Sequence, residues 1–141
     1  MSQRSVVILS GVRTAIGDYG GSLKDIAPTD LGARVVRDAI HRAKVDPADI
    51  GQCVIGNVIH TEAKDMYISR VAALNGGLPN TSGAFTVNRL CGSGMQAIVS
   101  ASQTILLGDH FTYYVLRITY YVLRTRRLFM ADKVRIGIIG V

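Results

Sequence analysis

Cys91 is the residue whose surroundings best suit covalent chemistry. It follows a short β-prone run at residues 84–87 and precedes Gly92-Ser93-Gly94 and a long apolar segment with helical character. Its sulfur would therefore lie at a helix N-terminus, where unpaired N–H groups and the helix dipole favour a thiolate. Backbone N–H groups at the same turn could hold an oxyanion, and the small glycines would admit a bulky thioester. The pattern predicts a cysteine nucleophile.

A packing role is the alternative for Cys91, because a free cysteine beside an apolar helix is commonly a small buried hydrophobe. Cys53 lies in a β-branched run with no helix start beside it, and we assign it to packing. The two cysteines supply neither a disulfide framework nor the paired spacing of a metal site. We expect no metal, no cofactor and a reducing, cytoplasmic setting.

The histidines and glycine-rich stretches give weaker indications. His41 falls on the polar side of a predicted helix and His60 follows a predicted strand, so neither is assigned a role. Gly20-Gly21 and Gly92-Ser93-Gly94 lack the Lys-Ser/Thr ending of a phosphate loop and the glycine fingerprint of a dinucleotide site. Nucleotide binding by residues 1–109 is not expected.

Alternating strands and helices are expected to position Cys91. A continuous β-branched run predicts a buried strand at residues 5–10, a second strand of the buried type is expected at 53–59, and a short strand at 84–87. Apolar residues at helical spacing predict helices at 29–44, 65–75 and 92–107. Thr29 or Asp30 would cap the first helix, and Gly11 would end the first strand. The last helix is apolar around most of its circumference, which is typical of a helix buried inside an α/β fold.

Composition is that of a globular chain of one-domain size, with 141 residues of which 48% are hydrophobic. The net charge of +6 is uneven: residues 1–109 hold ten basic and nine acidic side chains, whereas residues 110–141 hold six and one. The main body is therefore nearly neutral, and we expect no nucleic-acid partner. The apolar run at residues 6–9 is too short for a signal-peptide core or a membrane span, so no membrane association is expected.

Several stretches resemble the thiolase family. They are Gly-Val-Arg-Thr-Ala-Ile-Gly at residues 11–17, Gly-Gly-Ser-Leu at 20–23, Gly-Asn-Val at 56–58 and, above all, Val-Asn-Arg-Leu-Cys-Gly-Ser-Gly at 87–94. Asp-Met-Tyr at 65–67 and Asn-Gly-Gly at 75–77 are most similar to bacterial β-ketothiolases of the acetyl-CoA acetyltransferase group. The resemblance implies a thiolase-like layered α/β fold, present as an incomplete N-terminal half with a buried helix after the nucleophile.

The same resemblance implies an activity. Cys91 would take an acyl group from acyl-CoA, with its own backbone N–H in an oxyanion hole, for condensation to or thiolytic cleavage of 3-ketoacyl-CoA. Family members are dimers or tetramers. Their catalytic histidine, second cysteine and most of the CoA-binding loop come later in the family's sequence, and His41, His60 and His110 do not match those motifs. We expect the chain by itself to be inactive or partly active.

The resemblance stops near Asp109. Residues 110–141 read as an unrelated basic tail, in which Thr-Tyr-Tyr-Val-Leu-Arg occurs at 112–117 and again at 119–124. Residues 130–141 resemble the first strand of a Rossmann-type oxidoreductase, with only Gly140 of its glycine fingerprint. One hypothesis is a thiolase N-terminal domain, residues 1–109, joined to a chimeric or frameshifted tail.

Three other interpretations stay open. The chain could be a non-catalytic remnant or a subunit-interaction fragment. It could derive from a ketoacyl synthase, which also uses a cysteine at a buried helix start, although Asn-Arg-Leu and Gly-Ser-Gly around Cys91 favour thiolase. Finally, arginines interleaved with tyrosines could make the tail a strand pair or a surface-binding segment.

Overall fold

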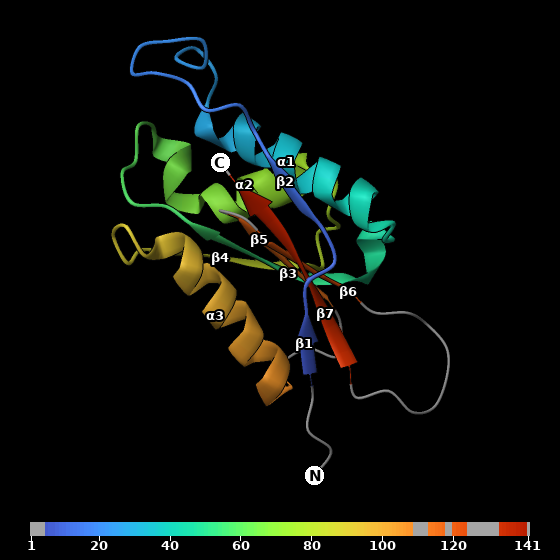
Figure 1. Ribbon diagram of the computed structural model, residues 1–141. Coiled ribbons are helices and arrows are strands. Elements are labelled where there is room, and N and C mark those ends of the chain that lie inside the picture. Colours follow the sequence, from blue (N-terminus) through green and yellow to red (C-terminus); the bar gives the residue numbers. More distant parts are fainter. Residues whose placement is uncertain (1–4, 109–112, 118–119, 124–132, 141) are drawn as a thin grey trace.

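The computed structural model describes residues 5–108, 113–117, 120–123 and 133–140, and describes side chains from Val6 to Gly108. The described strands form one mixed sheet with helices on both faces (Figure 1). This confirms the expected layered α/β fold. The order across the sheet is β1 (Ser5–Val7), β7 (Lys133–Gly140), β6 (Tyr120–Leu123), β5 (Tyr113–Arg117), β3 (Ile50–Gly56) and β4 (Gly83–Val87), and β2 (Gly11–Arg13) also pairs with β7.

Only Ser5–Val7 of the first predicted strand, residues 5–10, forms a strand, β1, and a second strand, β2, begins beyond it at Gly11. Val7 of β1 pairs with Arg135, and Gly11 of β2 pairs with Ile138. The chain therefore advances four residues from Val7 to Gly11 while β7 advances three. One extra residue interrupts the ladder, as in a β-bulge. Gly11 therefore begins the second piece, and the expectation that it ends the strand was wrong.

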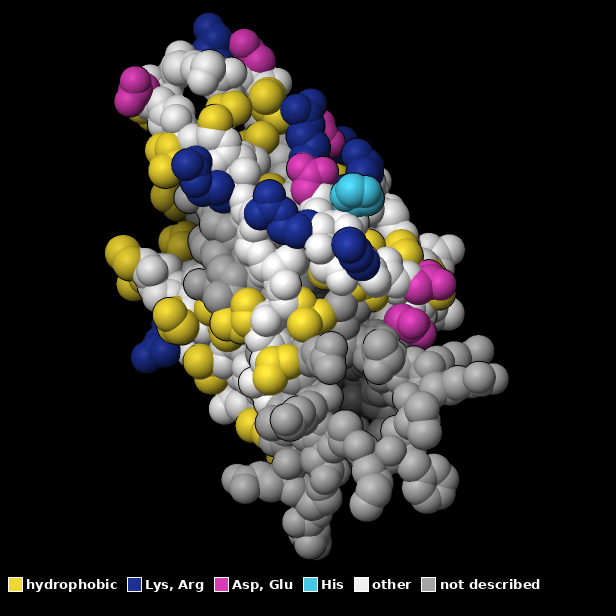
Figure 2. Space-filling model, turned by 45° about the vertical axis from the view of Figure 1, so that its right-hand side comes forward, with side chains coloured by type: hydrophobic (Ala, Val, Ile, Leu, Met, Phe, Trp, Pro, Cys, Tyr) yellow, Lys and Arg dark blue, Asp and Glu magenta, His cyan; other side chains and the backbone are white. Residues whose placement is uncertain are grey.

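Helix α1 (Pro28–Ala43) confirms the first predicted helix, but the predicted caps were wrong. The N-cap is Ala27, which makes no side-chain capping bond, and Pro28 follows at the position where a missing N–H has no cost. Val36 and Ala39 face the core, whereas the outer face is charged. Figure 2 shows basic and acidic side chains interspersed on this side, which is typical of a solvated surface.

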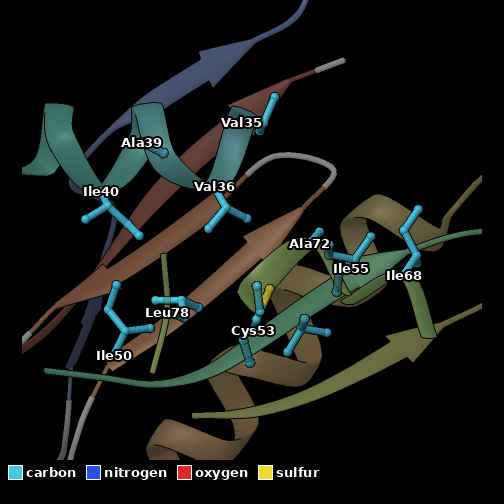
Figure 3. Packing of buried hydrophobic residues seen from close by; sticks show 14 of the residues in the cluster. Val35, Val36, Ala39, Ile40, Ile50, Cys53, Ile55, Ile68, Ala72 and Leu78 are labelled. Atoms are coloured by element: carbon cyan, nitrogen blue, oxygen red, sulfur yellow. The ribbon is translucent and has the colours of Figure 1, made fainter. Parts of the chain in front are cut away.

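Strand β3 lies at the centre of the core. It starts three residues before the predicted position because a 3-10 turn, Pro47–Asp49, leads directly into Ile50. Cys53 is fully buried here, as its assignment to packing requires. Figure 3 shows side chains from β3 meeting those of α1 and α2. The core cluster comprises Val35, Val36, Ala39, Ile40, Ile50, Cys53, Val54, Ile55, Ile68, Ala72, Ala73, Leu78, Ala97, Ala101 and Ile105.

The second predicted helix is a 3-10 turn, Ala63–Tyr67, followed by α2 (Ile68–Asn75). The Ser69 hydroxyl joins α2 to two strands: it accepts from the Ile55 N–H at 3.0 Å and donates to the Phe85 carbonyl at 2.7 Å. The Thr86 hydroxyl donates to the Ser69 oxygen at 3.0 Å. These bonds fix the carboxyl ends of β3 and β4 beside each other.

Helix α3 (Ser93–Leu107) lies across the sheet from α1 and α2 (Figure 1). Ala97, Ala101 and Ile105 are buried, but Met95 is 62% exposed and Leu107 is 77% exposed. The expectation of a helix buried all round is therefore met on one face only. Residues Leu90–Leu107 are long and apolar enough to cross a membrane, with mean hydropathy 1.2, a test that core helices of soluble proteins also pass.

Candidate active site

The turn between β4 and α3 presents Cys91. Its backbone is tight, because the Gly92 N–H donates to the Arg89 carbonyl and the Ser93 N–H donates to the Leu90 carbonyl, both at 3.0 Å. Leu90 has φ 46°, in the left-handed region, which costs a residue with a Cβ about 1–2 kcal/mol. Other contacts must hold this conformation.

Two side chains hold the turn. The Asn88 Oδ1 accepts from the Leu90 N–H at 3.0 Å. The Ser93 Oγ accepts from the Arg89 N–H at 2.8 Å and donates to the Leu90 carbonyl at 2.6 Å. Ser93 is also buried. The turn is therefore fixed by side-chain hydrogen bonds from its own flanking residues.

Cys91 itself is exposed and is not in a disulfide. Gly92 is the N-cap of α3, so the cysteine stands directly before the first turn of the helix. The first N–H groups of a helix have no carbonyl partners within it, and they favour an anion at this end. An exposed cysteine at this place suits a nucleophile that must meet a large substrate.

Gly56, at the end of β3, lets the start of α3 come close to the sheet. A Cβ on Gly56 would lie 2.7 Å from the Ser93 carbonyl carbon, 2.8 Å from its oxygen and 2.9 Å from the Gly94 nitrogen. All three are backbone atoms, so no side chain could rotate out of the way. The absence of a side chain at residue 56 thus sets the depth of the helix start.

The loop after β3 packs beside the Cys91 turn. The Asn57 N–H donates to the Val87 carbonyl at 3.0 Å, and the Asn88 Nδ2 donates to the Val58 carbonyl at 3.4 Å. The Asn57 Nδ2 also donates to the Asp65 carbonyl at 3.4 Å. The two loops at the carboxyl edge of β3 and β4 therefore form one hydrogen-bonded unit.

Asp65 anchors the far end of this loop with a fully buried carboxylate. Its Oδ2 accepts from the Thr61 N–H at 2.7 Å, the Thr61 hydroxyl at 2.8 Å and the Glu62 N–H at 3.2 Å. Burial raises the pKa of Asp65, but these hydrogen bonds and the nearby His60 outweigh it, so the pKa lies below its ordinary value of 3.8. The carboxylate is charged at neutral pH.

Asp65→Asn is expected to lower the free energy of unfolding at pH 7 by about 1–3 kcal/mol, because an amide accepts these bonds less strongly. A lowered folded-state pKa means that the carboxylate's contribution is complete above pH 3.8 and declines as pH falls through the folded-state value. Urea unfolding at a series of pH values checks this. A deficit that stays constant from pH 7 to the acid limit would contradict it.

The two histidines in the described part of the chain are both exposed. His41 lies on the exposed face of α1, and His60 lies in the exposed loop next to Asp65. In the part of the chain that the structure describes, neither histidine is hydrogen-bonded to Cys91, and His110 lies outside that part. A shallow hollow of about 350 Å³ between residues 24–28 and Thr61–Glu62 does not include Cys91.

Sequence reasoning missed the supporting residues. Gly56, Ser93 and Asp65 all stand in the stretches that carry the family resemblance without a role of their own, and Asp65 otherwise marks only the start of the second predicted helix. One signal was available: a serine three residues after Leu90 and at the first helical position can bond back to the turn. The contact of Gly56 with α3 had no signal in sequence spacing.

Comparisons with known proteins agree with this geometry. Residues 6–114 match the sequence family described as thiolase, N-terminal domain. The β-ketothiolase BktB of Cupriavidus necator is 67% identical over 106 residues, which are 75% of this chain and 27% of BktB. The crystal structure of the Bacillus anthracis acetyl-CoA acetyltransferase superposes with a TM-score of 0.74 at 30% identity, over 94% of this chain and 36% of that one.

The human mitochondrial 3-ketoacyl-CoA thiolase superposes with a TM-score of 0.71 at 37% identity, over 73% of this chain and 26% of that one. The chain thus spans about a quarter of the length of the curated relatives it matches, 27% for BktB and 26% for a Staphylococcus epidermidis acetyl-CoA acyltransferase.

Proposed function

The chain belongs to the thiolase family, by its N-terminal domain, and from that premise we propose that Cys91 accepts an acyl group from an acyl-CoA thioester. The observation that carries the proposal is the placement of an exposed cysteine on a strained, hydrogen-bonded turn directly before α3. Relatives named β-ketothiolase and acetyl-CoA acyltransferase support the reaction type.

The proposed step begins with attack of the Cys91 thiolate on the thioester carbonyl carbon, which forms a new S–C bond and a tetrahedral oxyanion. Backbone N–H groups at the turn stabilise the oxyanion. Collapse of this intermediate breaks the bond from the carbonyl carbon to the CoA sulfur. The CoA thiolate leaves and takes up a proton, and the acyl group stays on Cys91.

In the whole enzyme the acyl group then passes to the carbanion of a second acetyl-CoA, which is Claisen condensation. Thiolysis of 3-ketoacyl-CoA by free CoA is the reverse. These steps need acid and base groups, and among the described residues neither histidine is hydrogen-bonded to Cys91. We therefore infer that the 141-residue chain carries out acyl transfer to Cys91 and does not turn over.

Further properties belong to the same proposal. The chain acts in the cytoplasm on acyl-CoA, without a metal or other cofactor, and associates as a homo-oligomer through its exposed apolar residues. Such residues include Val58 and Ile59 beside the site and Leu106 on α3. Residues 1–109 are the thiolase N-terminal domain, and residues 110–141 are a tail of different origin.

The test is mass spectrometry of the purified chain after incubation with acetyl-CoA, with peptide digestion to map the product. One acetyl group on the peptide that contains Cys91 is the expected result, and prior treatment with iodoacetamide should prevent it. A folded chain that takes up no acetyl group would refute the proposal and favour a non-catalytic remnant.

A further inference from the structure

We propose that Ser93 is a positioning residue for Cys91, whose hydroxyl holds the turn that presents the sulfur to the thioester. This inference rests on the proposed acyl transfer to Cys91. It assigns to Ser93 a role in the placement of the reacting atom and no contact with substrate.

The first argument is the geometry of the bonds. The Ser93 Oγ accepts from the Arg89 N–H at 2.8 Å and donates to the Leu90 carbonyl at 2.6 Å. One hydroxyl therefore joins the Asn88–Arg89 peptide group to the Leu90–Cys91 peptide group, and this bridge across Arg89 and Leu90 restrains Leu90 at its φ of 46°. Cys91 follows at once, so any relaxation of Leu90 moves the sulfur.

The second argument is that packing does not hold Leu90. The residue is 69% exposed, so apolar contacts contribute little to keeping a leucine in the left-handed region. Ser93 is 2% exposed, so water has little access to replace its hydroxyl. Within the described residues, the side chains that bond to the backbone of the turn are those of Ser93 and Asn88, and they add to the two backbone bonds made by the Gly92 and Ser93 N–H groups.

The third argument is that the backbone of Ser93 is held in place by the sheet. Its carbonyl group lies against Gly56 so closely that a Cβ there would come within 2.8 Å of the oxygen. The helix start is thereby set against β3. Ser93 is thus fixed relative to β3 by its backbone, and its hydroxyl fixes the turn that places Cys91.

The test compares Ser93→Ala with Ser102→Ala. Ser102 is a matched control, because it lies on the same helix and its hydroxyl donates to the Ile98 carbonyl at 2.8 Å, away from the turn. For each variant, three quantities are measured: the rate of acetylation of Cys91 at saturating acetyl-CoA, the acetyl-CoA concentration for half that rate, and the rate of alkylation by iodoacetamide.

Ser93→Ala is expected to slow acetylation at saturation by about 10- to 100-fold, since a misplacement of roughly 1 Å costs up to about 100-fold. The half-saturating concentration and the alkylation rate should stay close to those of the unmodified chain, because the small reagent needs no particular placement. Ser102→Ala should leave all three quantities unchanged. Asn88→Ala, at an exposed residue, should also slow acetylation, by a smaller factor than Ser93→Ala.

Equal losses in Ser93→Ala and Ser102→Ala would show a general effect on the helix and overturn the proposal, as would normal acetylation of Ser93→Ala. If Ser93→Ala does not fold, a normal rate in Asn88→Ala overturns it and a reduced rate supports it. Failure of the unmodified chain to be acetylated is a separate result, which refutes the proposed function and the positioning role with it.

Discussion

Cys91→Ala is expected to abolish uptake of the acetyl group from acetyl-CoA while leaving the fold intact. The substitution removes the sulfur that forms the new bond, and the expected loss of adduct is complete. Because Cys91 is exposed, the free energy of unfolding should change by less than about 0.5 kcal/mol. Intact-mass spectrometry and urea unfolding of the same preparation measure the two quantities.

Cys53→Ala is the matched control for Cys91→Ala. It also removes one thiol, but from a fully buried position in β3, so a stability loss of about 1–3 kcal/mol is expected with the adduct retained. We thus expect opposite results from the two variants. Cys91→Ala loses the acetyl adduct and keeps its free energy of unfolding, whereas Cys53→Ala keeps the adduct and loses stability. An adduct that persists in Cys91→Ala would place the acyl acceptor elsewhere in the chain.

Gly56→Ala is expected to destabilise the chain by about 1–3 kcal/mol or more and to slow acetylation of Cys91. The new Cβ would meet backbone atoms of Ser93 and Gly94 at 2.7–2.9 Å, so the strand end or the helix start has to move. Either movement displaces the turn that carries Cys91. Urea unfolding measures the loss of stability, and the rate of acetylation of Cys91 under native conditions measures the effect of the displaced turn.

Gly83→Ala separates crowding from a general effect of adding a side chain to a glycine in a strand. A Cβ on Gly83, in β4, would have its nearest neighbour at 3.7 Å, which is ordinary van der Waals contact. We expect a stability change within about 0.5 kcal/mol and normal acetylation. Equal losses in Gly56→Ala and Gly83→Ala would contradict the assignment of Gly56 to the close approach of α3.

The sequence by itself determined the elements and the nucleophile candidate. Apolar residues repeat at helical spacing in α1 and α3, and short apolar runs indicate β3 and β4. An element that buries one face must repeat its apolar residues locally, so the pattern can be recognised in the sequence. The prediction for Cys91 was equally local, since a cysteine between a strand and a glycine-flanked helix start depends only on neighbouring residues. The family resemblance around residues 87–94 rested on the same short stretch.

The sequence-based predictions were wrong where the structure depends on contacts between segments far apart in the sequence. The interruption after Val7 depends on pairing with β7, more than 120 residues away in the sequence, and no local pattern encodes that register. The exposed face of α3 likewise depends on which elements cover it, and apolar periodicity reports only a capacity for burial.

The tertiary structure also decided how the site is held. Gly56 lies against the backbone of Ser93 because the start of α3 packs on the end of β3, and Ser93 restrains Leu90 in a conformation that leucine does not favour. Sequence spacing identifies groups that can react, since chemistry belongs to the side chain. Their placement results from contacts between segments remote in sequence, which only the folded chain brings together.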